Sequence, residues 1–232
     1  MNYRLTDYWV KNLKLVFRAI KKRLDKDCDS FLEQVSGVIH VGANIGQERK
    51  LYAKHNLDVL WIEPIPKIFK KLKNNLKKYP RQQGYQYLVT DRDNEQYEFH
   101  IANNNGLSSS ILNFDLHKDI WPQISYERSI ILQSTTLVSL LDKEDINIVK
   151  YDALVMDTQG SELLVLKGAE TLLNKFKYIK TEVSDFESYV GCCQIKDIED
   201  FLLKHGFREV SRHNFASRKE GGNYYDIVYK KL

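Results

Sequence analysis

The sequence has few cysteines, the residues whose disulfide bonds stabilise small or secreted folds. Only three of its 232 residues are cysteine: Cys192 and Cys193 are adjacent, and Cys28 is far away. This spacing gives no CxxC pair and no even disulfide framework, so we expect a reducing, cytoplasmic location. Eleven glycines and four prolines are too few for a collagen-like or linker-like chain.

Long apolar runs are missing as well. No stretch approaches the roughly 18 apolar residues that cross a membrane, and residues 1–9 lack the apolar core of a signal peptide. The charge is nearly balanced, with 35 Lys and Arg against 31 Asp and Glu and a net charge of +4. Dedicated nucleic-acid binders carry a larger, clustered excess, so we expect no nucleic-acid partner.

What is present is a soluble globular pattern of alternating strands and helices. Apolar runs predict buried strands, stretches of helical composition lie between them, and the last two runs predict an antiparallel hairpin. β-α-β units of this length indicate a doubly wound, mostly parallel sheet with helices on both faces. The predicted strands are 38–41, 59–62, 85–89, 153–156, 178–183, 207–212 and 224–229; the predicted helices are 46–55, 68–76, 162–173 and 195–205.

Two segments do not fit this alternation of strands and helices. Residues 8–24 have the spacing of a basic amphipathic helix, which either packs on its own domain or associates peripherally with a membrane surface or a partner. Residues 91–141 form an insertion before the fourth strand, with a strand-like alternation from 95 to 101 and no clean period from 115 to 134; such segments serve as lids or merely cover an edge. We therefore divide the chain into an N-terminal extension, 1–35, and a main domain, 36–232.

The segment Val38–Gln47 reads as a strand, a glycine turn and a helix. A dinucleotide fingerprint would need glycine at positions 42, 44 and 47. Gly42 complies, but Asn44 and Gln47 do not. Because the second glycine lets the backbone approach a pyrophosphate, the Asn44 side chain argues for a nucleoside ligand without one.

Three acidic residues follow predicted strands. Glu63 ends the second strand, where a carboxylate can accept both hydroxyls of a ribose. S-adenosylmethionine has such a ribose, no phosphate, and an amino-acid tail that loop amides can hold. Asp157 and Glu182 close the fourth and fifth strands and should meet at the same edge of the sheet. Glu162, at a helix start, is explained by the helix dipole.

Taken together, the segments 41–47, 62–64, 157–170 and 180–184 resemble the FkbM family of S-adenosylmethionine-dependent methyltransferases, over about residues 38–229. The resemblance implies a class I (Rossmann-like) sheet of seven strands with the last antiparallel, and S-adenosylmethionine as cofactor. It also implies O-methylation of a hydroxyl, commonly in a sugar of a glycan or in a metabolite.

The resemblance also implies roles for individual residues. The donor would be held by Gly42, Ala43, Asn44, Ile45, Gln47, Glu63, Pro64, Asp91 and Asp157, with Asp91 at the adenine. The small-molecule or glycan acceptor would lie near Asn103, Ser109, Gln159 and Glu182. Because a hydroxyl is a weak nucleophile, a base should assist. By their positions, Asp157 and Glu182 are the predicted catalytic bases, and His100 and His117 are the next candidates. A magnesium site at Asp157 and Glu182 is conceivable, but no ligand cluster supports one.

Three other functions stay open. A nucleic-acid methyltransferase usually carries an Asn/Asp-Pro-Pro-aromatic motif where this chain has Asp157-Thr158-Gln159-Gly160. A nicotinamide-dependent oxidoreductase or epimerase is disfavoured by Asn44. A non-catalytic, methyltransferase-like subunit could bind a partner through residues 8–24. The oligomeric state is not encoded in any pattern that we find.

Overall fold

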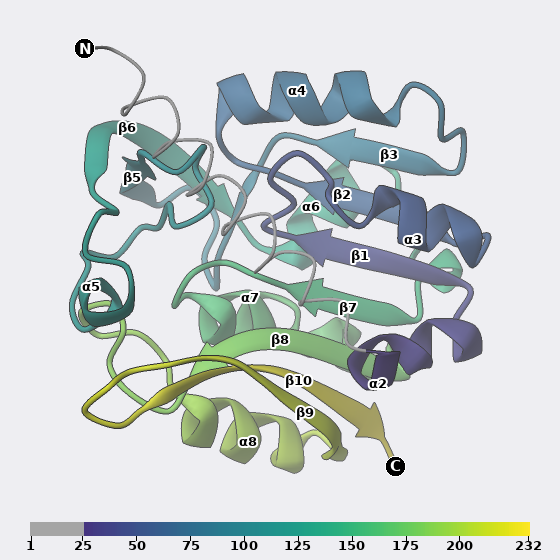
Figure 1. Ribbon diagram of the computed structural model, residues 1–232. Coiled ribbons are helices and arrows are strands. Elements are labelled where there is room, and N and C mark those ends of the chain that lie inside the picture. The colour runs from purple at the N-terminus through teal and green to yellow at the C-terminus, as the bar shows by residue number, and fades with distance from the viewer. Residues whose placement is uncertain (1–25) are drawn as a thin grey trace, which may run out of the picture.

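A central sheet organises the computed structural model, which describes residues 26–232 (Figure 1). Within that part of the chain the sheet has seven strands in the order β3-β2-β1-β7-β8-β10-β9. The first five are parallel, and β10 is antiparallel to both β8 and β9. The predicted doubly wound sheet with an antiparallel last strand is therefore confirmed. The strands are β1 (Gly37–Val41), β2 (Asp58–Ile62), β3 (Gln82–Tyr85), β7 (Ala153–Met156), β8 (Tyr178–Ser184), β9 (Phe207–Ser217) and β10 (Asn223–Lys231).

Helices cover both faces of this sheet, because successive side chains of a buried strand point to opposite sides. Ile39 and Val41 pack with α6 (Leu137–Lys143), α7 (Glu162–Gly168) and α8 (Ile195–Lys204). Val38 lies on the other face, in a cluster with residues of α2 (Lys26–Asp29), η1 (Ser30–Gln34), α3 (Arg49–Lys54) and α4 (Pro66–Leu76). The buried stripe predicted for α4, namely Ile68, Leu72 and Leu76, is confirmed.

Two strands of the insertion join the short strand that precedes it in a second, three-stranded sheet, in the order β4-β6-β5. Its strands are β4 (Leu88–Val89), β5 (Gln96–Ala102) and β6 (Tyr126–Thr135), and α5 (His117–Ile120) precedes β6. In Figure 1 this sheet stands beside the ends toward which the arrows of β1 and β7 point. An apolar cluster of Ile65, Ile68, Leu88, Phe99 and Ile101 joins it to the start of α4. The insertion thus borders the carboxyl edge of the main sheet.

Several predicted boundaries are wrong. The strand predicted at 85–89 is two strands in different sheets, because the chain leaves the main sheet after Tyr85 and Leu88 packs against the insertion. The aperiodic stretch 115–134 contains the long strand β6, whose alternation is blurred by the exposed Ile131. The helix predicted from residue 46 begins at Arg49, after a turn in which Gly46 has φ +71°.

Two further elements differ in type. The helix predicted over 162–173 ends at Gly168 and continues as the 3-10 helix η3 (Glu170–Lys175), while η2 (Ile148–Lys150) precedes β7. Helix α6 spans residue 141, the predicted end of the insertion.

The predicted helix 8–24 lies outside the described residues. In the described part of the chain, no helix combines the length and the apolar character that crossing a membrane requires.

Candidate active site

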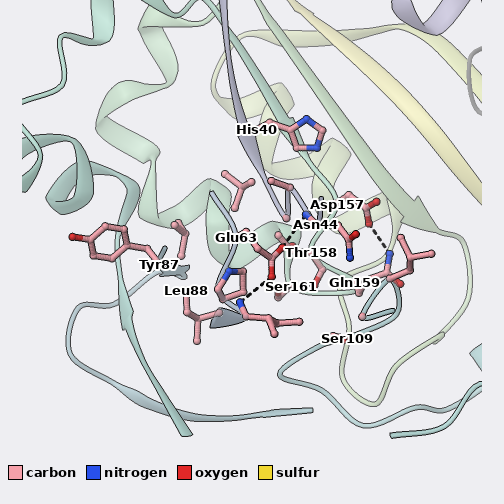
Figure 2. Close-up of a pocket in the computed structure, with 18 of the residues that line it drawn as sticks. His40, Asn44, Glu63, Tyr87, Leu88, Ser109, Asp157, Thr158, Gln159 and Ser161 are labelled. Carbon is pink, nitrogen blue, oxygen red and sulfur yellow. Dashed lines mark hydrogen bonds between the residues drawn. The ribbon is translucent and has the colours of Figure 1, made fainter. Parts of the chain in front are cut away.

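A cavity opens at the carboxyl edge of β1, β2 and β7, where the strand order reverses and open α/β sheets bind their ligands. It encloses about 710 Å³, its open mouth included. Figure 2 shows Glu63 inside it, with Tyr87 and Leu88 to one side and Asp157 and Gln159 to the other. Its walls come from the glycine loop, the ends of β2 and β7, and the insertion. The lining residues are His40, Val41, Gly42, Ala43, Asn44, Gln47, Glu48, Glu63, Pro64, Ile65, Tyr87, Leu88, Val89, Phe99, Gly106, Leu107, Ser109, Asp157, Thr158, Gln159 and Ser161.

The glycine loop after β1 uses its own backbone donors. The amides of Gly42 and Ala43 both donate to the carbonyl of Ile62 at 3.0 Å. The Asn44 amide donates to Glu63 at 2.8 Å, and the Asn44 side chain accepts from the next amide, that of Ile45, at 2.9 Å. A pyrophosphate needs such loop amides for itself. The loop therefore fits a ligand without a pyrophosphate, as the sequence predicts.

Glu63 is a buried carboxylate of the cavity with both of its oxygens hydrogen-bonded. Its side chain is buried, and its two oxygens accept hydrogen bonds from the amides of Asn44 and Ile65, each at 2.8 Å. Burial, which penalises the charged form, raises the pKa of Glu63 to about 8, while the two amide bonds oppose this shift. Each oxygen keeps acceptor capacity for a second donor, such as a ribose hydroxyl.

Asp157 and Glu182 meet through a shared partner, the side-chain amide of Gln159. Its Nε2 donates to Asp157 Oδ1 at 2.6 Å and to Glu182 Oε1 at 3.0 Å. Gln159 adopts φ +56°, a left-handed conformation that costs roughly 1–2 kcal/mol for a residue with a Cβ. The backbone carbonyl of Gln159 accepts from Ser110 Oγ at 2.8 Å, which ties this turn to the insertion.

Glu162 does more than its predicted helix-dipole role. It is buried, and its carboxylate accepts from the amides of Thr158 at 2.8 Å and Gly160 at 3.0 Å. Burial raises the pKa of Glu162 above its ordinary value. These bonds close the turn after β7, so Glu162 shapes the loop that presents Asp157 and Gln159.

The structure gathers most of the predicted site residues at this cavity but leaves four outside its lining. The Asp91 carboxylate forms an ion pair with the neighbouring Arg92, with Oδ2 3.9 Å from Nε. Asn103 donates to the carbonyl of Gln123 at 3.1 Å. Glu182 borders a smaller neighbouring cavity of about 230 Å³ that shares Gln159 with the first. The fourth, Ile45, packs against the apolar cluster that joins the insertion to α4.

The two histidines that were the next candidates for the base, His100 and His117, do not line the cavity. His100 bonds through Nδ1 to Ser129 Oγ at 2.8 Å and stacks on Tyr126. His117 is buried among aromatic rings, and burial lowers its pKa to about 4. Among residues 26–232 no group of three histidine, cysteine, aspartate or glutamate side chains is placed to hold a metal ion.

Sequence reasoning missed several lining residues because they carry no motif. Tyr87 and Leu88 form an apolar wall where the chain passes between the two sheets. His40 sits within β1, and its Nδ1 lies 3.0 Å from the hydroxyl of Tyr52. Thr158 Oγ1 is buried and has no hydrogen-bond partner among the described residues. His40 and Thr158 lie in segments that the sequence singles out, but nothing in those patterns marks either residue.

Comparisons with known proteins identify the family of this chain. The family model "Methyltransferase FkbM domain" matches residues 40–209. The 2-O-methyltransferase NoeI of Sinorhizobium fredii is 28% identical over 182 residues, which cover 75% of this chain and 74% of that protein. The methyltransferase domain of METTL16 is 13% identical with a TM-score of 0.50, covering 88% of this chain and 65% of that one. That likeness bears on the fold alone.

A further similar structure is the magnesium protoporphyrin IX methyltransferase of Synechocystis PCC 6803, with bound S-adenosylmethionine. It is 11% identical, with a TM-score of 0.49, and covers 100% of this chain and 85% of that chain. The family match spans well over half of the sequence, including the glycine loop and the turn after β7. This chain therefore belongs to the FkbM methyltransferase family, with the class I methyltransferase fold and S-adenosylmethionine as its methyl donor.

Proposed function

We propose that this protein transfers the methyl group of S-adenosylmethionine to a hydroxyl oxygen, and that this hydroxyl belongs to a sugar of a glycan or of a glycosylated metabolite. The observation that carries the proposal is the pair of carboxylates, Asp157 and Glu182, held by one amide beside the donor cavity. A hydroxyl needs a group that takes its proton as it attacks carbon, and a positioned carboxylate can do so.

The donor cavity has the chemistry that S-adenosylmethionine requires. Glu63 offers two carboxylate oxygens to a ribose, and Leu88 and Val89 offer an apolar side to an adenine ring. The buried Thr158 Oγ1 offers a hydrogen bond that no described residue uses. When bound, the donor supplies an electrophilic methyl carbon on a positively charged sulfur.

The chain's own residues then act on the acceptor. Asp157 borders the donor cavity and Glu182 borders the smaller one, so the two carboxylates flank Gln159. Either carboxylate can accept the hydroxyl proton, and the buried setting strengthens its interaction with the acceptor. Fixing the reacting groups in place supplies much of the rate, since good alignment gains roughly 7–11 kcal/mol.

A sugar acceptor is supported by two observations. Polar side chains gather beside the donor cavity, and the oxygens of Glu182, Ser184, Ser188 and Tyr224 suit hydrogen bonds to a polyhydroxylated ligand. The relative NoeI is a 2-O-methyltransferase by its name. By contrast, the internally bonded glycine loop argues against a nicotinamide cofactor, because few loop amides remain for a pyrophosphate.

The experiment that tests the proposal has two stages. The purified protein is titrated calorimetrically with S-adenosylmethionine, its demethylated product and NAD in parallel. We expect saturable binding of the first two and none of NAD. Transfer of labelled methyl from the donor is then measured with nucleotide sugars and glycans, and with small amines as matched non-hydroxyl acceptors. Transfer to amines alone would contradict the proposal.

A further inference from the structure

The Gln159 amide is the bridge between the two carboxylates, and its orientation decides whether that bridge attracts or repels them. With Nε2 facing Asp157 and Glu182, at 2.6 and 3.0 Å, each carboxylate receives one N–H donor. A flipped amide would present its carbonyl oxygen to both carboxylates instead. With both carboxylates ionised, three acceptor oxygens would then face one another. Only the orientation seen here gives both ionised carboxylates a donor.

One hydroxyl fixes that orientation. Tyr189 donates its phenolic hydrogen to Gln159 Oε1 at 2.7 Å. The same hydroxyl lies 3.5 Å from the carbonyl of Ser108, a second acceptor. Burial raises the pKa of Tyr189 well above its ordinary value, so the phenol keeps its hydrogen. With Gln159 flipped, the phenol would accept from an NH₂ group and its hydrogen would have to turn to the Ser108 carbonyl, so a bond of 2.7 Å would be exchanged for one of 3.5 Å.

Tyr189 can enforce this choice because its ring cannot move easily. The side chain is 1% exposed. The ring packs against Phe114, with centroids 5.4 Å apart, and stacks with His117 at 5.2 Å. Tyr189 comes from the segment after β8 and Phe114 from the insertion, and an isolated β-bridge joins their backbones. The hydroxyl is therefore held at the amide by contacts from two distant parts of the chain.

Other charges face the same pair. Glu63, Glu162 and Tyr224 each interact electrostatically with Asp157. Lys180 lies two residues before Glu182 on β8, and Asp226 is the β10 residue opposite Glu182. All of these groups stay in place when the Tyr189 hydroxyl is removed. A change that follows its removal is therefore assigned to the amide.

We propose that Tyr189 is a positioning residue: its hydroxyl locks the Gln159 amide so that Asp157 and Glu182 both receive an N–H donor and stand ready to take the acceptor's proton. The inference deepens the proposed function and rests on it for the role of the carboxylates. The lock itself is a property of the protein without ligands and can be measured there.

The test follows the two carboxylates directly. The carboxyl carbons of Asp157 and Glu182 are titrated by ¹³C NMR in the wild-type protein and in Tyr189→Phe. Without the hydroxyl the Gln159 amide is no longer held and can turn its Nε2 away from a carboxylate. Loss of that donor disfavours the charged form, so we expect at least one midpoint to rise by about one pH unit in the variant. In the methyl-transfer assay, the apparent pKa of the acid limb of the pH profile of kcat should rise by the same amount. Donor affinity should change less than twofold.

A matched control and a double variant separate this lock from general packing. Tyr126→Phe removes another hydroxyl of the same aromatic cluster, which donates to the Leu112 carbonyl at 2.6 Å, and should leave the midpoints unchanged. Gln159→Leu should raise the midpoints by itself, and adding Tyr189→Phe should raise them no further. Unchanged midpoints in Tyr189→Phe, or additive shifts in the double variant, would overturn the inference. If the wild type transfers no methyl group, the proposed function fails, but the titration still decides the lock.

Discussion

At the scale of single residues, the site depends on carboxylates that are buried (Glu63 and Glu182) or half-buried (Asp157) and supplied with donors. Glu63 has two backbone amides, and Asp157 and Glu182 share one side-chain amide. Burial alone would neutralise such groups, and hydrogen bonds to the charged form oppose that effect. Each carboxylate is thus suited to accept a hydrogen bond or a proton from a ligand.

At pH 9, where Glu63 is ionised, Glu63→Ala should weaken binding of S-adenosylmethionine by about 1–3 kcal/mol, since hydrogen bonds to a charged group are lost. Calorimetry measures the affinity, and circular dichroism checks that the variant is folded. Unchanged affinity in a folded variant would remove the ribose role from Glu63.

The raised pKa of Glu63, about 8, has consequences for pH dependence. Between the ordinary pKa of a glutamate and about pH 8, Glu63 binds a proton in the folded state but not in the unfolded state. The free energy of unfolding should therefore fall by about 1.4 kcal/mol for each unit by which the pH rises across that window. Donor binding should show the opposite trend and tighten as pH rises toward 8, because ribose hydroxyls favour the ionised form. Both trends should flatten in Glu63→Gln. A wild-type affinity that stays constant from pH 6 to 8 would contradict this expectation.

Asp157→Asn should lower kcat more than donor affinity, because the amide cannot take the acceptor's proton. We expect a loss of about 10²–10⁴-fold in turnover, the range for a positioned acid or base. Steady-state kinetics measures kcat, and calorimetry measures donor binding. Equal losses in both would make Asp157 a binding residue instead.

At the scale of elements, the turn after β1 is set by the close approach of two chain segments. Gly42 has φ +83°, and a Cβ there would lie 1.9 Å from the backbone carbonyl oxygen of Asp157. Real Cβ atoms do not come so near, so any side chain must push β1 and β7 apart. These are the two strands between which the strand order reverses and the cavity opens.

Gly42→Ala should therefore abolish donor binding and destabilise the fold by more than the roughly 1–2 kcal/mol that a left-handed conformation costs. Gly191→Ala is the matched control, since Gly191 has φ +71° but a Cβ there would meet no atom of the described residues within 4 Å. It should lose only the conformational cost and keep its donor affinity. Urea unfolding and calorimetry compare the two variants, and similar losses in both would show that sterics at Gly42 do not matter.

At the scale of the whole molecule, the donor site joins the two sheets. The main sheet supplies Glu63 and Asp157, while the insertion supplies Phe99 and Ser109 to the same cavity. The bond from Ser110 to the Gln159 carbonyl adds a polar link between the two layers. A ligand in this cavity contacts both, so binding should stabilise the molecule as a unit.

S-adenosylmethionine or its demethylated product, at about 100 times its Kd, should stabilise the folded state by about 2.7 kcal/mol. For a chain of this size that corresponds to a rise in Tm of roughly 5–10 °C. Thermal unfolding with and without each ligand measures this rise, with NAD as the control that should leave Tm unchanged. A rise with NAD alone would contradict the donor assignment.

Much of this protein is determined by its sequence. Apolar runs such as 153–156 predict strands because a fully buried strand must be apolar throughout. The glycine turn and Glu63 predict a nucleoside site because strand ends meet at one edge of a parallel sheet. By contrast, β6 was not predicted, because an insertion strand with one exposed face mixes apolar and polar residues without a regular period. The short β4 was predicted as part of the preceding strand, because its two buried residues continue that apolar run.

Only the tertiary structure decided how distant segments complete the site. Tyr189 reaches Gln159 from 30 residues further along the chain, and Ser110 reaches it from 49 residues earlier. Neither residue belongs to a motif. Asp91, to which the family resemblance assigns the adenine, lies outside the cavity lining, whereas Tyr87 and Leu88 line it. Local sequence sets the strands, turns and acidic strand ends, because these depend on neighbouring residues. The orientation of one amide between two carboxylates depends on packing between segments far apart in the chain, and local sequence cannot specify it.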